Sequence, residues 1–136
     1  MTFSELIHCE EELLKRLLMV SKRQLEIVEL GNAGVLVEHL GRRERLWHEF
    51  ELLEEQLTPH KGIPPEQRVW KNPEERQQTE AALNRCKGLL DEIMATDEIS
   101  LAKAAKLKDE AEKNLRRVQL SKPVAPAYMK QSQLHR

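Results

Sequence analysis

The side chains that most often perform reactions in proteins are scattered along this chain without a shared pattern. Among its five histidines, His48 follows Glu44 by four residues, a spacing that can place two metal ligands on one face of a helix. That spacing is common in charged helices, and no third ligand stands near it. The segment from Gly31 to Gly34 lacks the lysine and the preceding strand of a phosphate-binding loop. We therefore expect no enzyme, no metal site and no cofactor.

The two cysteines, Cys9 and Cys86, both fall on apolar faces of expected helices. Cys86 has no helix start beside it that would lower the pKa of its thiol and make it a nucleophile. Our interpretation is that both are reduced thiols of the core. A disulfide between two helices is the alternative.

Composition sets the class of protein. The chain has 136 residues, the length of one domain, and a third of them are charged while 4% are aromatic. These proportions are typical of long, solvated helices with narrow cores. With 22 basic and 23 acidic side chains, the whole chain has no strong net charge to attract nucleic acid or anionic lipid. The basic residues after Glu112 lack interleaved aromatics, so we expect no nucleic-acid partner.

The first residues carry neither the basic segment nor the apolar segment of a secretory signal peptide. No stretch approaches the 18 or so apolar residues that a membrane span needs. We therefore expect a cytoplasmic protein without membrane insertion.

Apolar residues recur every three or four positions in three stretches, and predict helices at about 3–30, 33–57 and 73–119. Thr2 and Glu5 form a capping-box pattern at the first start. Gly31 ends the first helix and Asn32 caps the second, so these two helices are expected to be antiparallel neighbours. Pro59 is expected to end the second helix, before a crossover at 58–72.

The third helix is too long for the other two to cover. At about 1.5 Å per residue it would extend about 70 Å, against about 42 and 38 Å for the first two. Either it bends, near Gly88 or Asp97, or its far half projects and packs against a partner or a second copy. The fold class is thus all-α, an elongated antiparallel three-helix bundle resembling a coiled coil, with a long third helix. We assign residues 1–120 to the bundle and 121–136 to a flexible basic tail.

Several residues allow two interpretations. Trp47 and Phe50 are expected in the core, although an exposed anchor for a partner helix is the alternative. Trp70 either closes one end of the bundle or offers an aromatic surface to a ligand. Arg43 interrupts the apolar stripe of the second helix. Asp97 lies on the apolar seam of the third helix, either as a solvated residue near a bend or as a polar residue that fixes helix register.

The segment from Leu90 to Leu101, with Ile93 and Asp97, resembles a motif in the last long helix of the flagellar export chaperone family. The segment from Leu120 to Tyr128 is similar to the basic segment, ending near a tyrosine, into which that helix continues in the family. The Gly31-Asn32 hinge and the arginines at the start of the second helix also fit its layout.

This resemblance implies a cytosolic chaperone that binds the terminal helix of an unassembled flagellar hook-filament junction, cap or filament subunit. Such a chaperone keeps its client monomeric and delivers it to the type III export machinery, including the export gate and ATPase components. The alternative is a structural coiled-coil or adaptor subunit with a permanent helical partner, and a homodimer is also open. The expected partner-binding residues are Ile93, Asp97, Leu101, Ala104, Leu107 and Tyr128.

Overall fold

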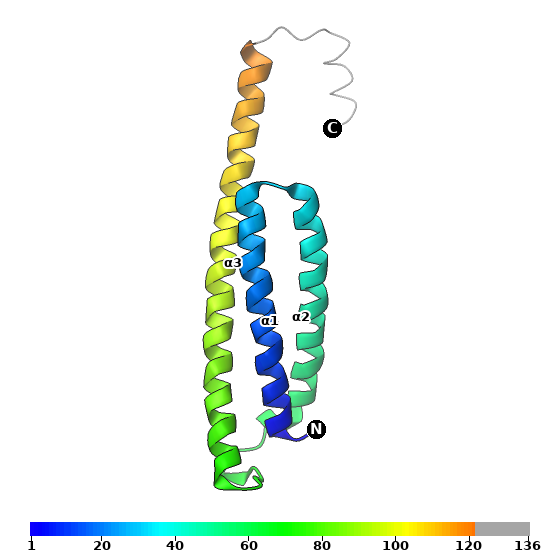
Figure 1. Ribbon diagram of the computed structural model, residues 1–136, viewed down its shortest axis with the longest axis vertical. Coiled ribbons are helices and arrows are strands. Elements are labelled where there is room, and N and C mark those ends of the chain that lie inside the picture. The colour runs from blue at the N-terminus through cyan, green and yellow to red at the C-terminus, as the bar shows by residue number, and fades with distance from the viewer. Residues whose placement is uncertain (122–136) are drawn as a thin grey trace.

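The computed structural model of the chain describes residues 1–121 and consists of helices. Helix α1 (Phe3–Leu30), helix α2 (Ala33–Lys61) and helix α3 (Pro73–Ser121) form an elongated bundle, with a short 3-10 turn, η1 (Pro65–Gln67), in the crossover before α3 (Figure 1). The prediction of an all-α three-helix bundle is confirmed.

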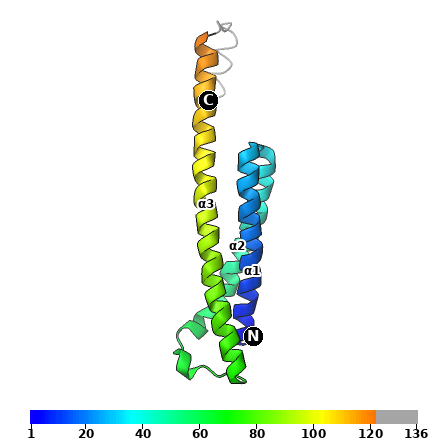
Figure 2. The same ribbon diagram turned by 60° about the vertical axis from the view of Figure 1, so that its left-hand side comes forward.

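The chain runs up, down and up, so α1 and α3 are parallel and α2 is antiparallel to both (Figures 1 and 2). Three contacts fix the register between α1 and α3: Thr79 Oγ1 donates to Ser4 Oγ at 2.9 Å, and ion pairs join Glu11 to Arg85 and Glu29 to Lys103. The sequence offset between partners stays at 74 or 75 residues along the whole of α1. The two helices are therefore aligned in parallel over the length of α1.

The helix ends follow the local signals of the sequence. Thr2 Oγ1 accepts a hydrogen bond from the Glu5 amide at the start of α1. Gly31 adopts a left-handed conformation with φ of 70°, and its N–H donates to two carbonyls of the last turn of α1. Asn32 Oδ1 then accepts from the Val35 amide and caps α2. The expected antiparallel turn between α1 and α2 is confirmed.

Pro59 does not end α2, which corrects the expected boundary at residue 57. The helix continues through Pro59 to Lys61, and the crossover shrinks to residues 62–72. Near a helix end a proline removes one backbone hydrogen bond, while its fixed φ still suits helical geometry. Gly62 follows as the C-terminal cap residue.

The core consists of two clusters of buried residues. One surrounds Leu14 and Leu17 of α1 and includes Cys86 and Ile93 of α3. Half-buried Trp47 and Phe50 pack against it with their rings edge to face, 5.3 Å between centroids. The second cluster contains Leu6, Ile7, Leu57 and Ala82. The interpretation of Trp47 and Phe50 as core residues is confirmed.

Trp70 packs at the crossover end of the bundle. Its ring lies edge-on to the ring of Phe3, with 6.1 Å between the two centroids. The guanidinium of Arg68 stacks over the Phe3 ring, 4.1 Å from the ring centroid. Phe3 also contacts His60 at the end of α2. Of the two interpretations of Trp70, this packing supports the one in which it closes the bundle end.

Helix α3 is unbroken from Pro73 to Ser121, and its last part extends past the turn between α1 and α2 (Figures 1 and 2). No break near Gly88 or Asp97 interrupts it, and the projection of its last part is confirmed, while its packing against a partner or a second copy stays a prediction. Within residues 1–121, no helix combines the length and the apolar character needed to cross a membrane.

Candidate partner-binding surface

The part of α3 at residues 104–119 extends beyond the other helices, and we call it the overhang. It begins after Lys103, whose ammonium pairs with Glu29 in the last turn of α1. At about 1.5 Å per residue the overhang is about 24 Å long. Its leucines are largely exposed: 41% of the surface of Leu107 and 58% of that of Leu115 remain accessible.

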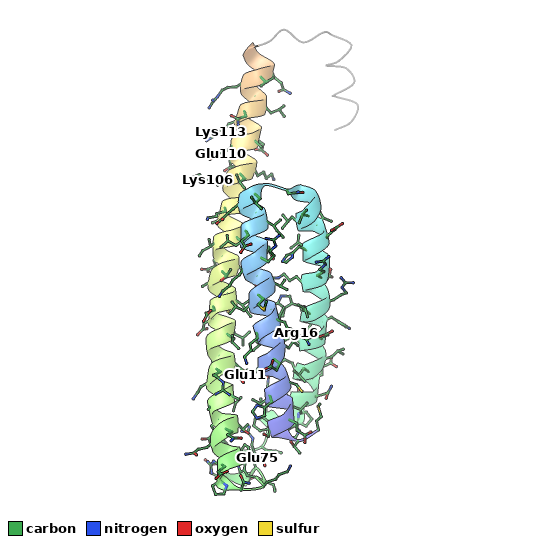
Figure 3. The ribbon with its side chains drawn as sticks, in the orientation of Figure 1. Glu11, Arg16, Glu75, Lys106, Glu110 and Lys113 are labelled. Carbon is green, nitrogen blue, oxygen red and sulfur yellow. The ribbon has the colours of Figure 1, made fainter. Side chains whose placement is uncertain are left out.

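The exposed leucines continue the face that α3 buries inside the bundle. Thr79, Ala82, Cys86, Ile93 and Ser100 are buried, and each follows the last by three, four or seven residues. The same spacing leads on to residues 104, 107, 111 and 115. Charged residues occupy the other side: Figure 3 shows Lys106, Glu110 and Lys113 projecting away from α1 and α2. The overhang is thus an amphipathic helix whose apolar face lies in line with the bundle core.

The structure divides the expected partner-binding residues into three groups. Ile93 is 1% exposed and packs in the core, so it offers no surface in this conformation. Asp97 is bonded to α2. Leu101 is 74% exposed, Ala104 is half-buried, and exposed Leu107 lies within the overhang. Tyr128 lies outside the described residues, so its expected role stays a prediction. Leu101, Ala104 and Leu107 are therefore the members that leave accessible surface on α3.

Asp97 belongs to a polar bridge across all three helices. Arg43 Nη1 of α2 donates to Asp97 Oδ1 at 2.7 Å, and Arg43 Nη2 donates to Asp97 Oδ2. The same Nη1 also donates to Ser21 Oγ at 3.0 Å and to Gln24 Oε1 at 2.9 Å, both on α1. This bridge ties α1, α2 and α3 together where two of their apolar stripes are interrupted. It favours the interpretation of Asp97 as a register-fixing residue over that of a solvated one.

The sequence did not predict that Ser21 and His39 would be buried at or near this polar bridge. Ser21 is fully buried, and buried His39 places Nε2 2.7 Å from the carbonyl oxygen of Val20. A signal was present, since Ser21 follows Leu14 and Leu17 at helical spacing on the apolar face of α1. His39 lies four residues before Arg43, so both fall on the same side of α2.

A pair of carboxyl groups forms a second polar site between α1 and α2. Burial, and then the hydrogen bond with Glu54 and the charge of that carboxylate, raise the pKa of Glu10 to about 7, although Lys61 acts to lower it. Burial alone would raise the pKa of Glu54 too, but hydrogen bonds with Glu10 and Lys61 hold it below its ordinary value. Below pH 7, Glu10 therefore carries the proton of the pair and Glu54 the negative charge.

The neighbouring Glu11 behaves differently because an arginine faces it. Its Oε2 accepts from Arg85 Nε at 2.6 Å, and its Oε1 accepts from Arg85 Nη2 at 3.1 Å. This bidentate bond lowers the pKa of Glu11 and keeps the carboxylate charged. The pKa values of the adjacent Glu10 and Glu11 are thus shifted in opposite directions.

Neither cysteine is placed for catalysis. Cys86 is buried, and burial raises the pKa of its thiol to about 12, the opposite of what a nucleophile requires. Cys9 is exposed, which corrects its expected place in the core, since it lies on the side of α1 away from α3. Both are free thiols. Among residues 1–121, no three side chains of the metal-binding types His, Cys, Asp and Glu gather closely enough to hold an ion.

Comparisons of this chain with protein-family models, with curated proteins and with solved structures give no match in any of the three.

Proposed function

We propose that this chain is an export chaperone that binds the terminal helix of an unassembled flagellar hook-filament junction, cap or filament subunit. It keeps that subunit monomeric and delivers it to the type III export machinery in the cytoplasm. The observation that carries the proposal is the apolar face of α3, which continues past the bundle as the exposed side of the overhang.

The surface suits a helical client because of its spacing. Leu101, Ala104 and Leu107 stand three residues apart, and Ala111 and Leu115 follow at intervals of four. Amphipathic helices dock on one another through such i, i+3, i+4 and i+7 positions. The three leucines supply the largest apolar area, and Ala104 and Ala111 let a client backbone approach closely.

The flagellar identity of the client rests on the resemblance of the segment from Leu90 to Leu101 to the export chaperone family. On the same resemblance, the tail around Tyr128 contacts the export gate or ATPase components. These two contacts are separable by mutation. Tyr128→Ala should weaken capture of an export component while leaving client binding unchanged.

Fluorescence anisotropy with labelled peptides tests the client site. The peptides span the terminal helices of the junction, cap and filament subunits of the source organism, with a scrambled peptide as the control. We expect one of the native peptides to bind the full-length chain, and Leu101→Asp to weaken that binding at least tenfold. Ile99→Asp is the matched control, because Ile99 is also exposed but lies about 160° around the helix from Leu101.

Two results would contradict the proposal. One is that no native peptide binds better than the scrambled control. The other is that Ile99→Asp weakens binding as much as Leu101→Asp does. A stable oligomer that persists at nanomolar concentration and binds no peptide would favour the structural adaptor instead.

A further inference from the structure

Glu10 of α1 and Glu54 of α2 meet about two turns before α2 ends at the crossover. We propose that this pair is a proton-dependent latch for the crossover end of α2, residues 50–61. While the two carboxyl groups share a proton, this segment stays packed on α1. When the proton leaves, the segment separates from α1 and the rest of the bundle stays folded. The latch belongs to the free chain, so it does not depend on the identity of a client.

The contact between the two carboxyl groups requires a proton. A carboxylate has acceptors and no donor, so two of them can be joined by a hydrogen bond only when one is protonated. Glu10 is 7% exposed and is hydrogen-bonded to Glu54, whose side chain is 30% exposed. Loss of the proton therefore leaves two like charges in contact at a place that water scarcely reaches on the Glu10 side.

The cations on the helices that face Glu10 are bonded to other carboxylates. On α2, the ammonium of Lys61 pairs with Glu54, although its charge also acts to lower the pKa of Glu10. On α3, Arg85 makes its bidentate bond with Glu11. Neither cation is bonded directly to Glu10, so a charge on Glu10 would lack a partner of its own in this conformation.

Two further titratable groups lie at this end of the bundle. Burial raises the pKa of the Cys86 thiol on α3 to about 12, so this thiol stays neutral around pH 7. His60, in the last turn of α2, contacts the ring of Phe3. Glu10→Gln leaves both groups in place, so the pH profile of this variant separates their effects from that of Glu10.

The arrangement of the helices allows the crossover end of α2 to open by itself. Within residues 1–121, the backbone of α2 comes close to α1 and not to α3. Toward the other end of α2, Arg43 is bonded to Asp97, Ser21 and Gln24, and these bonds need no proton shared between carboxyl groups. An arginine keeps its charge throughout the range around pH 7. The polar bridge therefore holds that part of α2 when the latch is released.

Opening would uncover apolar surface. Leu57 of α2 is fully buried, and it packs with Leu6 and Ile7 of α1 and Ala82 of α3. Separation of residues 50–61 from α1 removes Leu57 from this cluster and lets water reach the others. The burial of Leu57 is thus the main apolar contribution that opposes opening at this end.

Hydrogen–deuterium exchange of the full chain from pH 5 to pH 8, without peptide, tests the latch. Each rate is corrected for the intrinsic pH dependence of amide exchange. The closed pair holds its proton with a pKa of about 7, against 4.5 for a solvated glutamate. The opening constant of residues 50–61 should therefore rise at least about tenfold from pH 5 to pH 7 and level off above that. Residues 35–46 should change much less.

Two variants assign the effect to the pair. Glu10→Gln keeps a donor for Glu54 and has no proton to lose, so it should abolish the rise. Glu54→Gln should reduce the rise, because its amide can donate to the Glu10 carboxylate without a shared proton. Having both variants keeps the test decisive if one of them fails to fold. Glu12→Gln, at an exposed position of α1, is the matched control and should keep the full rise.

Three results would overturn the latch. The first is that protection of residues 50–61 in the parent chain does not change with pH. The second is that Glu10→Gln retains the rise, which would assign it to another group such as His60. The third is an equal loss of protection in all three helices, which would mean that the whole bundle unfolds. Because no peptide is present, each result is independent of whether the chain binds a flagellar subunit.

Discussion

Asp97 of α3 accepts hydrogen bonds from both terminal nitrogens of Arg43 on α2, and this pair joins two helices whose backbones do not approach each other closely. Within residues 1–121, no Cα of α2 lies within 8 Å of a Cα of α3, whereas α1 approaches both helices closely. The side chains of Arg43 and Asp97 are 14% and 31% exposed, so the pair is largely shielded from water. It lies close to the end of the bundle from which the overhang extends.

We predict that Asp97→Ala destabilises the fold by about 1–3 kcal/mol, because it leaves the Arg43 guanidinium partly buried without its carboxylate. Chemical denaturation measures the change. Arg76→Ala, which breaks the exposed pair with Glu80, is the control and should cost less than about 0.5 kcal/mol. Equal effects of the two variants would mean that the bridge contributes no more than a surface ion pair.

The carboxyl pair predicts a pH dependence of stability. Because the folded state raises the pKa of Glu10 from 4.5 to about 7, it binds this proton more tightly than the unfolded chain does. The stabilisation from this group is therefore complete below pH 4.5 and is lost as the pH rises through 7. Glu11 and Glu54, whose pKa values are lowered, act in the opposite direction and lose their contribution as the pH falls below 4.5.

Glu10→Gln should therefore be more stable than the parent chain above pH 7, by about 1–3 kcal/mol, since glutamine keeps a donor for Glu54 without a charge. Denaturation at pH 5 and pH 8 measures the difference. Glu12→Gln, at an exposed position of the same helix, should show no such gain. A loss of stability in Glu10→Gln at pH 8 would show that the fold stabilises the charged form of Glu10, so that its pKa is not raised.

Leucines inside and outside the bundle should respond differently to truncation. Leu14 is fully buried, so Leu14→Ala should cost about 2–5 kcal/mol through lost burial and the cavity left behind. Leu115→Ala should change stability by less than about 0.5 kcal/mol when measured at a concentration where the chain is monomeric. A large loss for Leu115→Ala in the monomer would place that leucine against the bundle.

The two thiols should differ in reactivity. Cys9 is exposed and lines a groove between α1 and α2, whereas Cys86 is buried with a pKa raised to about 12. A colorimetric thiol reagent should therefore label one cysteine of the native chain rapidly and the second only after denaturant is added. Rapid labelling of both in native buffer would mean that the contact between α1 and α3 opens readily.

Local signals in the sequence predicted most of the fold. Helix caps depend on neighbouring residues, so Thr2, Gly31 and Asn32 marked boundaries that the structure confirms. The excess length of α3 predicted the overhang, because rise per residue is fixed in a helix. The helix end expected at Pro59 was wrong, because a proline near a helix end destabilises the helix less than a proline in its middle.

The polar contacts between helices were not predictable from the same signals. Whether Arg43 meets Asp97 depends on the relative register of α2 and α3, which the crossover and the packing on α1 set together. Glu10 stands in a run of three glutamates, yet it is 7% exposed because its position on α1 faces α2. Ile93 was expected at the partner surface, although the face it occupies becomes exposed only further along α3.

The most direct test of the central claim is hydrogen–deuterium exchange of the full-length chain with and without the flagellar peptide that binds best. We expect the amides of residues 101–119 to exchange rapidly in the free chain and to become protected when peptide is added, while protection of the bundle core stays unchanged. Peptide binding that protects the groove between α1 and α2, and leaves residues 101–119 unprotected, would contradict it.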